Sequence, residues 1–149
     1  MREVLIDWLI DVAREFTFTD ETLHLAVGYV NRTLTALDIP ESKLQLVGIT
    51  AMMIAAKFEE IYPPQVEEYV EITDNTYTKK QVFAMEHIIL NTLRFDVSGV
   101  TASYFSNRIL KLCRADQRTA ALTKVNYNKD KIVVTLTQRV IISIKSTRL

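Results

Sequence analysis

The feature of this sequence that most restricts its fold is a segment, residues 44–56, in which nearly every residue is apolar. Its polar interruptions are Gln45 and Thr50. A helix that is apolar on all sides has to be surrounded by other elements, and this one is shorter than the roughly 20 residues that a membrane span requires. We therefore expect it to be the central helix of a bundle. Its small residues would let neighbouring helices approach closely: Gly48, Ala51, Ala55 and Ala56.

The segments on either side of this helix carry helical patterns joined by short loops. Apolar residues spaced three or four apart predict helices over about residues 1–15, 20–37, 65–72 and 79–94, with a partial extra helix from Thr101. The scarcity of glycine and proline, three of each, suits long helices with few sharp turns. The sequence thus predicts an all-α fold, a five-helix bundle built around the central apolar helix.

Short motifs mark where several of these helices should begin. Thr19 or Asp20 can cap the second helix. Residues 42–45 (Ser-x-x-Gln) and 78–81 (Thr-x-x-Gln) have the form of a capping box, in which the two side chains bond each other's backbone N–H groups. We expect these two boxes to open the third and fifth helices.

The last segment, residues 125–149, differs in character from everything before it. It contains β-branched runs at 132–134 and 140–142, and five basic residues against one acidic residue. It is either a basic interaction tail or a segment that does not belong to the fold of the domain and is poorly ordered or weakly helical. We favour the second interpretation.

Composition excludes several classes of protein. Eighteen basic and eighteen acidic residues cancel, which argues against a dedicated nucleic-acid binder with its basic surface. Cys113 is the single cysteine, so there is no disulfide framework, and a reducing intracellular compartment is expected. The amphipathic, charged start of the chain is unlike a secretory signal. We expect a soluble protein that binds neither nucleic acid nor a membrane.

The residues needed for catalysis or metal binding do not occur in suitable patterns. The three glycines lie far apart, so no phosphate-binding loop is predicted. His24 and His87 fall on separate helices, without cysteines or carboxylates at metal-ligand spacing. No Ser/His/Asp triad can be assembled. We therefore expect no catalytic residue, no metal and no cofactor.

Lys57 is unusual because it ends the central apolar helix and is followed by Phe58, Glu59 and Glu60. A lysine that emerges from a buried helix needs a carboxylate partner. Glu86, in the middle of the fifth helix, is the candidate. The two residues would form either an internal ion pair or a charged pair exposed at an interface, and the sequence leaves both open.

The first helix carries more apolar surface than a small bundle has to bury. Met1, Val4, Leu5 and Trp8 crowd one face of it, and Arg2 stands one residue into the same helix. These apolar residues either belong to the core or line an exposed groove that receives a peptide. Both interpretations remain open on composition alone.

Several long motifs, in order, resemble those of a known family. Residues 1–9 (Met-Arg-Glu-Val-Leu-Ile-Asp-Trp-Leu) are similar to the opening of the cyclin box, as are residues 21–27, 43–48 and 56–64 (Ala-Lys-Phe-Glu-Glu-Ile-Tyr-Pro-Pro). Residues 72–81 resemble the A-type mitotic cyclins in particular. The resemblance covers about residues 1–95 and fades through residue 124.

This resemblance implies a division of the chain into three parts. Residues 1–99 would form an N-terminal cyclin box of five helices. Residues 100–124 would begin a second cyclin repeat that is truncated near Val125, and residues 125–149 would be a divergent tail. The implied protein is a regulatory subunit, without enzymatic activity, of a cyclin-dependent serine/threonine kinase.

The resemblance also implies how the chain works and where. The cyclin would hold the regulatory helix of the kinase inward and so activate it during S phase and the G2/M transition, in the nucleus and cytoplasm. The residues that match the kinase-binding surface of the family are Lys57, Glu86, Phe58, Ile54, Glu59, Leu90 and Phe95.

A second surface of the family captures Arg-x-Leu segments of substrates and inhibitors. Asp11 stands where the family usually has a glutamate that receives the arginine of the motif, so the charge is kept but the reach is shorter. The other positions that match this docking patch are Met1, Val4, Leu5, Trp8, Leu44 and Gln45.

One run departs from the family. Its Asp-Arg-Phe-Leu sequence appears here at residues 31–34 as Asn-Arg-Thr-Leu. The family aspartate pairs with the arginine at position 2; Asn31 can still accept a hydrogen bond from Arg2 but has lost the charge, and breaking a buried ion pair can cost ~3–5 kcal/mol. Thr33 in place of phenylalanine removes apolar volume, at about 3–5 kcal/mol if fully buried. We expect a box less stable than its relatives.

Two alternatives to an activating subunit remain. The chain could be a truncated cyclin variant that binds without activating, or a general helical adaptor. The combination of a Lys57–Glu86 pair with a docking patch argues against the adaptor.

Overall fold

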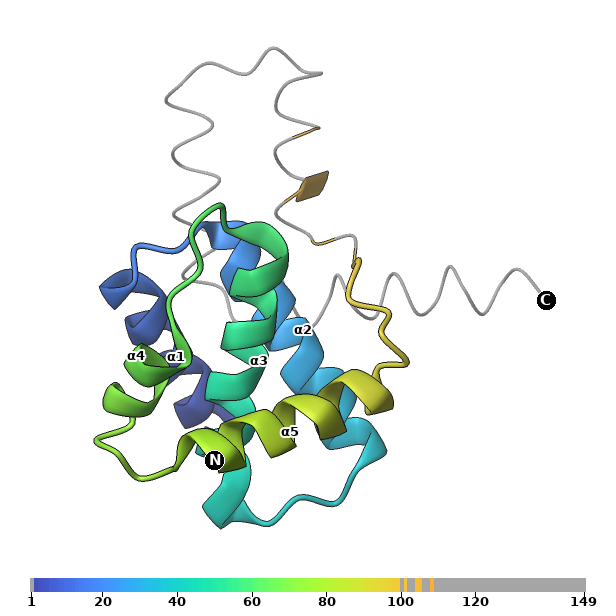
Figure 1. The fold of residues 1–149 in the computed structure, drawn as a ribbon. Helices are drawn as coiled ribbons and strands as arrows, with labels where there is room; N and C mark the ends of the chain where they lie inside the picture. The colour runs from blue at the N-terminus through green and yellow to red at the C-terminus, as the bar shows by residue number, and fades with distance from the viewer. Residues whose placement is uncertain (1, 100, 102–103, 106–107, 109–149) are drawn as a thin grey trace, which may run out of the picture. The chain divides into compact units, whose positions relative to one another are not determined.

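The structure, a computed structural model, describes residues 2–99, 101, 104, 105 and 108 of the 149-residue chain. Within these residues there are α helices, one short 3-10 helix and no strand, which confirms the all-α prediction (Figure 1). The helices are α1 (Arg2–Glu15), α2 (Asp20–Ala36), η1 (Glu41–Lys43), α3 (Leu44–Glu59), α4 (Val66–Glu71) and α5 (Lys79–Thr92).

The chain divides into two compact units, Met1–Thr101 and Ala102–Leu149, and the helices α1 to α5 lie in the first. The expected truncated repeat at 100–124, including Cys113, falls almost entirely outside the described residues. The divergent tail at 125–149 lies outside them completely. No described helix has the length and apolar character needed to cross a membrane.

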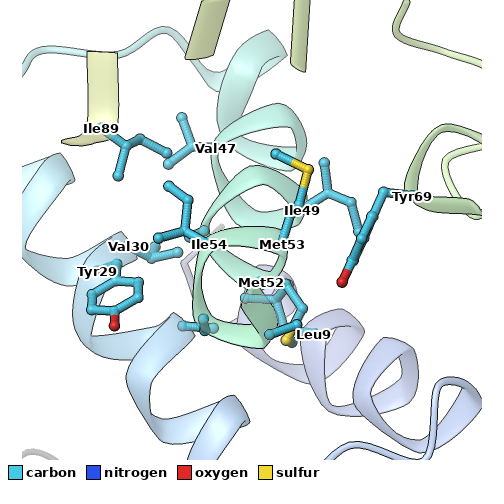
Figure 2. Close-up of a cluster of buried hydrophobic side chains, with 14 of the residues drawn as sticks. Leu9, Tyr29, Val30, Val47, Ile49, Met52, Met53, Ile54, Tyr69 and Ile89 are labelled. Atoms are coloured by element: carbon cyan, nitrogen blue, oxygen red, sulfur yellow. The ribbon is translucent and has the colours of Figure 1, made fainter. Parts of the chain in front are cut away.

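The central position of α3 is confirmed. Every residue from Leu46 to Ala56 is buried, and α1, α2, α4 and α5 all contact this helix. Figure 2 shows Leu9 of α1, Val30 of α2, Tyr69 of α4 and Ile89 of α5 among the buried side chains around α3. A helix without a solvated side gains its stability from this packing, because burial of apolar surface contributes about 25 cal/mol per Å².

Gly48 shows why small residues are needed in α3. A Cβ atom at this position would lie 2.9 Å from Cδ1 of Leu5 and 3.5 Å from Cδ2 of Leu9. The first distance is shorter than a normal carbon–carbon contact, so Gly48 permits the close approach of α1 to α3. The predicted role of small residues at helix contacts is therefore confirmed at this crossing.

The helix starts agree with the sequence in two cases of three. The Thr19 side chain caps α2 by accepting a bond from Thr22 N–H, and Thr78 with Gln81 forms the predicted capping box of α5. The box predicted at residues 42–45 is wrong. Residues 41–43 form a 3-10 turn that runs directly into α3, so Lys43 is the N-cap and no side chain caps this helix.

Three helices are followed by left-handed turns without glycine. Thr17, Asp74 and Arg94 have φ values of 54°, 52° and 53°, a region that costs a non-glycine residue about 1–3 kcal/mol. In each turn the next residue donates its N–H to a carbonyl five positions earlier, as in a Schellman motif. These bonds are Phe18 to Ala13 (2.9 Å), Asn75 to Val70 (3.2 Å) and Phe95 to Leu90 (2.9 Å).

Glu60, just after α3, ties that helix to the start of α2. Its Oε1 accepts hydrogen bonds from the Thr19 N–H (2.9 Å), the Thr19 hydroxyl (3.1 Å) and the Thr22 hydroxyl (2.5 Å). A carboxylate at a helix N-terminus also interacts favourably with the helix dipole. The end of α3 and the beginning of α2 are therefore held together by one side chain.

Two buried threonines of α2 allow a matched test of this packing. Thr22 and Thr33 are both fully buried, but Thr22 donates to Glu60, whereas the Thr33 hydroxyl has no hydrogen-bond partner among the described residues. An unsatisfied buried hydroxyl costs about 1–3 kcal/mol. We expect Thr33→Val to raise the free energy of unfolding, measured by chemical denaturation, and Thr22→Val to lower it, each by about 1–3 kcal/mol. Equal changes of one sign would contradict this assignment.

Candidate functional site

The predicted pair of Lys57 and Glu86 is present at the surface where α3 and α5 meet. Lys57 lies in the last turn of α3 and Glu86 in the middle of α5, with Nζ and Oε1 2.6 Å apart. The lysine side chain is 45% exposed and the glutamate 17%. The pair is therefore partly open to solvent and is not a fully internal ion pair; its place in an interface stays a prediction.

The neighbours of Lys57 on α3 divide into core and surface. Phe58 is 49% exposed, which is unusual for a large aromatic side chain. Ile54, one turn earlier, is 4% exposed and belongs to the hydrophobic core. Its role as a contact residue stays a prediction, and in the free chain its side chain offers little exposed area.

Two further predicted contact residues follow Glu86 along the chain. Leu90, one turn after Glu86, is half-buried and packs against the core. Phe95, in the left-handed turn that follows α5, is 64% exposed. Exposed aromatic rings are enriched at protein-binding surfaces, where they supply much of the binding energy.

Acidic residues gather at the end of α3. Glu59 is exposed, and partial burial together with the neighbouring Glu21 and Glu60 carboxylates raises its pKa above the ordinary value. Within the described part of the chain, no group of three or more His, Cys, Asp or Glu side chains is placed to hold a metal ion. The arrangement of Lys57, carboxylates and exposed rings suits recognition of another protein surface.

The predicted docking patch on α1 is only partly exposed. Val4 is exposed and Trp8 is half-buried, packed against the core. Leu5 is 6% exposed and lies against α3 at Gly48, so it belongs to the core, and its part in the patch stays a prediction. Met1 lies outside the described residues. The apolar residues of α1 are therefore of both kinds that the sequence left open: Leu5 lies in the core, whereas Val4 is exposed and Trp8 is half-buried.

The polar member of the patch, Asp11, is exposed and paired with Arg14 of the same helix, 3.2 Å from Nη1 to Oδ1. Leu44 and Gln45, at the start of α3, are both half-buried. Asp11 lies on α1 and the other two residues lie on α3, and these two helices are in contact. The predicted patch residues that are exposed or half-buried in the described structure are Val4, Trp8, Asp11, Leu44 and Gln45.

The predicted contact between Arg2 and Asn31 is only half described. Asn31 is buried in α2, and its backbone carbonyl accepts a hydrogen bond of 2.8 Å from the Thr35 hydroxyl. Arg2 begins α1, but its side chain lies outside the described part of the structure. The lower stability expected from the change at residues 31–34 stays a prediction.

Sequence reasoning missed two residues of α2 that hold the segment after α5. Arg32 donates from Nη1 to the Asp96 carbonyl at 2.8 Å, and the Tyr29 hydroxyl donates to the Val97 carbonyl at 2.6 Å. Their partners lie more than 60 positions away and are backbone atoms. No periodicity or motif in the sequence signals such a contact.

Comparison with known proteins places these features in a family. The pattern of the family described as "Cyclin, N-terminal domain" matches residues 1–98. Human cyclin-A2 is 54% identical over 105 residues, which cover 70% of this chain and 24% of that protein. G2/mitotic-specific cyclin-A of Patella vulgata is 46% identical over 123 residues, or 83% of this chain and 29% of that protein.

The fold likeness extends to a solved structure with few identical residues. The X-ray structure of a viral cyclin from Herpesvirus saimiri superposes with a TM-score of 0.74 at 20% identity, covering 81% of this chain and 53% of the viral one. The chain spans about a quarter of the length of the curated relatives named above. Its matching family pattern and its A-type relatives, together with the five α helices of residues 2–99, show that the chain belongs to the cyclin family and carries the N-terminal cyclin box of an A-type cyclin.

Proposed function

We propose that this chain acts as a regulatory subunit, not an enzyme, that binds and activates a cyclin-dependent serine/threonine kinase. The observation that carries the proposal is the partly solvent-accessible Lys57–Glu86 pair, with Phe58 exposed on α3 and Phe95 exposed in the turn after α5. The relatives' printed names, which include G2/mitotic-specific cyclin-A, support a role in cell-cycle control. Action at S phase and the G2/M transition, in the nucleus and cytoplasm, is part of the proposal.

The mechanism follows from differential binding. A kinase with an inward and an outward position of its regulatory helix shifts toward the state that the cyclin binds better. The Lys57–Glu86 surface would hold that helix inward, so that the kinase's own Lys–Glu ion pair forms and its activation loop moves. The cyclin then contributes binding energy and no chemical group to the reaction.

We further propose that the α1 surface docks Arg-x-Leu segments of substrates and inhibitors. Asp11 would receive the arginine, and Val4 and Trp8 would contact the leucine, with Leu44 and Gln45 beside them. Arg14 already occupies the Asp11 carboxylate in the free chain, but an exposed ion pair contributes only about 0–1 kcal/mol and is easily exchanged.

The kinase interface can be tested by reversing one charge. Lys57→Glu replaces the cation of the pair with a second carboxylate beside Glu86. A kinase surface that is complementary to the Lys57–Glu86 pair would then be repelled. We expect the Kd for a cyclin-dependent kinase, measured by surface plasmon resonance, to rise roughly 30-fold or more, the size of an interface hot spot of about 2 kcal/mol.

Lys79→Glu provides a matched control for this experiment. Lys79 also pairs with a glutamate, Glu67, and both side chains are about half exposed, so the same reversal is made on another exposed pair. Its Kd should stay within about twofold of the parent, because Lys79 is not part of the proposed kinase surface and loss of its surface pair costs little stability. Equal affinity of Lys57→Glu and the parent chain would refute the interface.

Histone phosphorylation by the same complex separates activation from binding. Kinase binding without stimulated phosphorylation would identify the chain as a competitor of an activating cyclin.

The docking surface allows changes in both directions. Val4→Lys puts a cation on an exposed position and should weaken binding of a fluorescent Arg-x-Leu peptide about tenfold through loss of an apolar contact and repulsion of its arginine. Arg14→Gln frees Asp11 and should tighten binding by up to about fivefold. Fluorescence anisotropy measures both. Kinase affinity should be unchanged in both variants, and a parallel loss of kinase binding in Val4→Lys would contradict two separate surfaces.

A further inference from the structure

The turn that follows α5 has two consecutive residues in the left-handed region. Arg94 has φ 53° and Phe95 has φ 57°. Side chains other than glycine rarely adopt this conformation, and consecutive cases persist only where the surrounding structure fixes them. Such outliers cluster at binding sites and clamps. Phe95 is also one of the exposed rings of the proposed kinase surface.

Two sets of hydrogen bonds fix this turn. The first is local: Arg94 N–H donates to the Asn91 carbonyl at 3.0 Å, and Phe95 N–H donates to the Leu90 carbonyl at 2.9 Å. These are the two bonds of a Schellman motif, in which the residue at the left-handed position is normally glycine. Arg94 at that position carries a conformational cost that glycine would not, and contacts from outside α5 can offset it.

The second set comes from α2 and supplies that support. The Arg32 guanidinium reaches the Asp96 carbonyl (2.8 Å), the Asp96 carboxylate (3.3 Å) and the Leu93 carbonyl (3.5 Å). Tyr29 donates to the Val97 carbonyl at 2.6 Å. Burial raises the pKa of the Tyr29 hydroxyl to about 12, so this group keeps its proton and remains a donor at physiological pH. The backbone is thus held on both sides of Arg94 and Phe95.

From this geometry we infer that Arg32 and Tyr29 are positioning residues for the kinase interface: they hold the left-handed turn that presents the Phe95 ring. Neither residue has to touch the kinase. The inference rests on the proposed function of the Lys57–Glu86 surface and assigns the preorganisation of one of its rings to α2. Without the α2 bonds, Arg94 and Phe95 would relax toward negative φ and the ring would leave its position.

The first test measures the turn without any kinase. Amide hydrogen exchange, followed by NMR, should become at least tenfold faster at Phe95 in Arg32→Ala. The amide of Phe18 is the internal control, because it makes the same kind of bond, to Ala13, in the turn after α1. Its exchange should not change. Unaltered exchange at Phe95 overturns the inference whatever the chain binds.

The second test asks whether the turn matters for binding, and position 94 offers a matched pair of variants. Asparagine tolerates the left-handed region, whereas valine is strongly disfavoured there. Both changes remove the same charge. We expect Arg94→Val to weaken kinase binding about tenfold, as Arg32→Ala does, and Arg94→Asn to preserve it. When Arg94→Asn is added to Arg32→Ala, the double variant should bind the kinase at least threefold more tightly than Arg32→Ala alone.

A double-mutant cycle distinguishes positioning from general loss of stability. Arg32→Ala should have no further effect on the Kd in the Phe95→Ala background, because the ring it positions is already absent. An equal loss in both backgrounds overturns the inference. Lys57→Glu in the same assay reports on the proposed function separately. If that variant and Phe95→Ala weaken binding while Arg32→Ala does not, the interface stands and the positioning role is wrong.

Discussion

Complete burial of α3 is the constraint on which the rest of the structure depends. A helix with no solvated face from Leu46 to Ala56 requires neighbours on every side, and α1, α2, α4 and α5 provide them. The buried stretch contains no charged residue, and Lys57 stands at the point where the helix leaves the core. The charged pair with Glu86 is therefore a consequence of how the core ends.

The α2 helix connects the two sides of the proposed kinase surface. At its start, Thr19 and Thr22 donate to Glu60, which follows the end of α3. Toward its end, Tyr29 and Arg32 bond the segment after α5. The predicted surface is built from α3 and α5. The segments that follow these two helices are held by α2, which contributes none of the predicted contact residues. Rigid support of this kind reduces the ordering cost of binding.

The fold could be predicted from the sequence because its signals are local. Apolar periodicity located the helices, and Thr78 with Gln81 marked the start of α5 correctly. The pairing of Lys57 with Glu86 followed from one rule about buried charges. The box at 42–45 failed because a 3-10 turn, which differs from a helix by small changes in dihedral angle, took its place. The left-handed turns lack the glycine that usually marks such turns. The α2 contacts have backbone partners distant in sequence, and residue types do not encode these. Burial of Leu5 and Ile54 likewise depends on how closely helices cross.

Photocrosslinking tests the central claim, that a kinase meets the surface at the end of α3, most directly. A photoreactive phenylalanine analogue in place of the exposed Phe58 should crosslink to the regulatory helix of a bound cyclin-dependent kinase, identified by mass spectrometry of the crosslinked peptides. The same analogue in place of Val4 on α1 should give no such product. Crosslinks to the kinase from position 4 and none from position 58 would contradict the account.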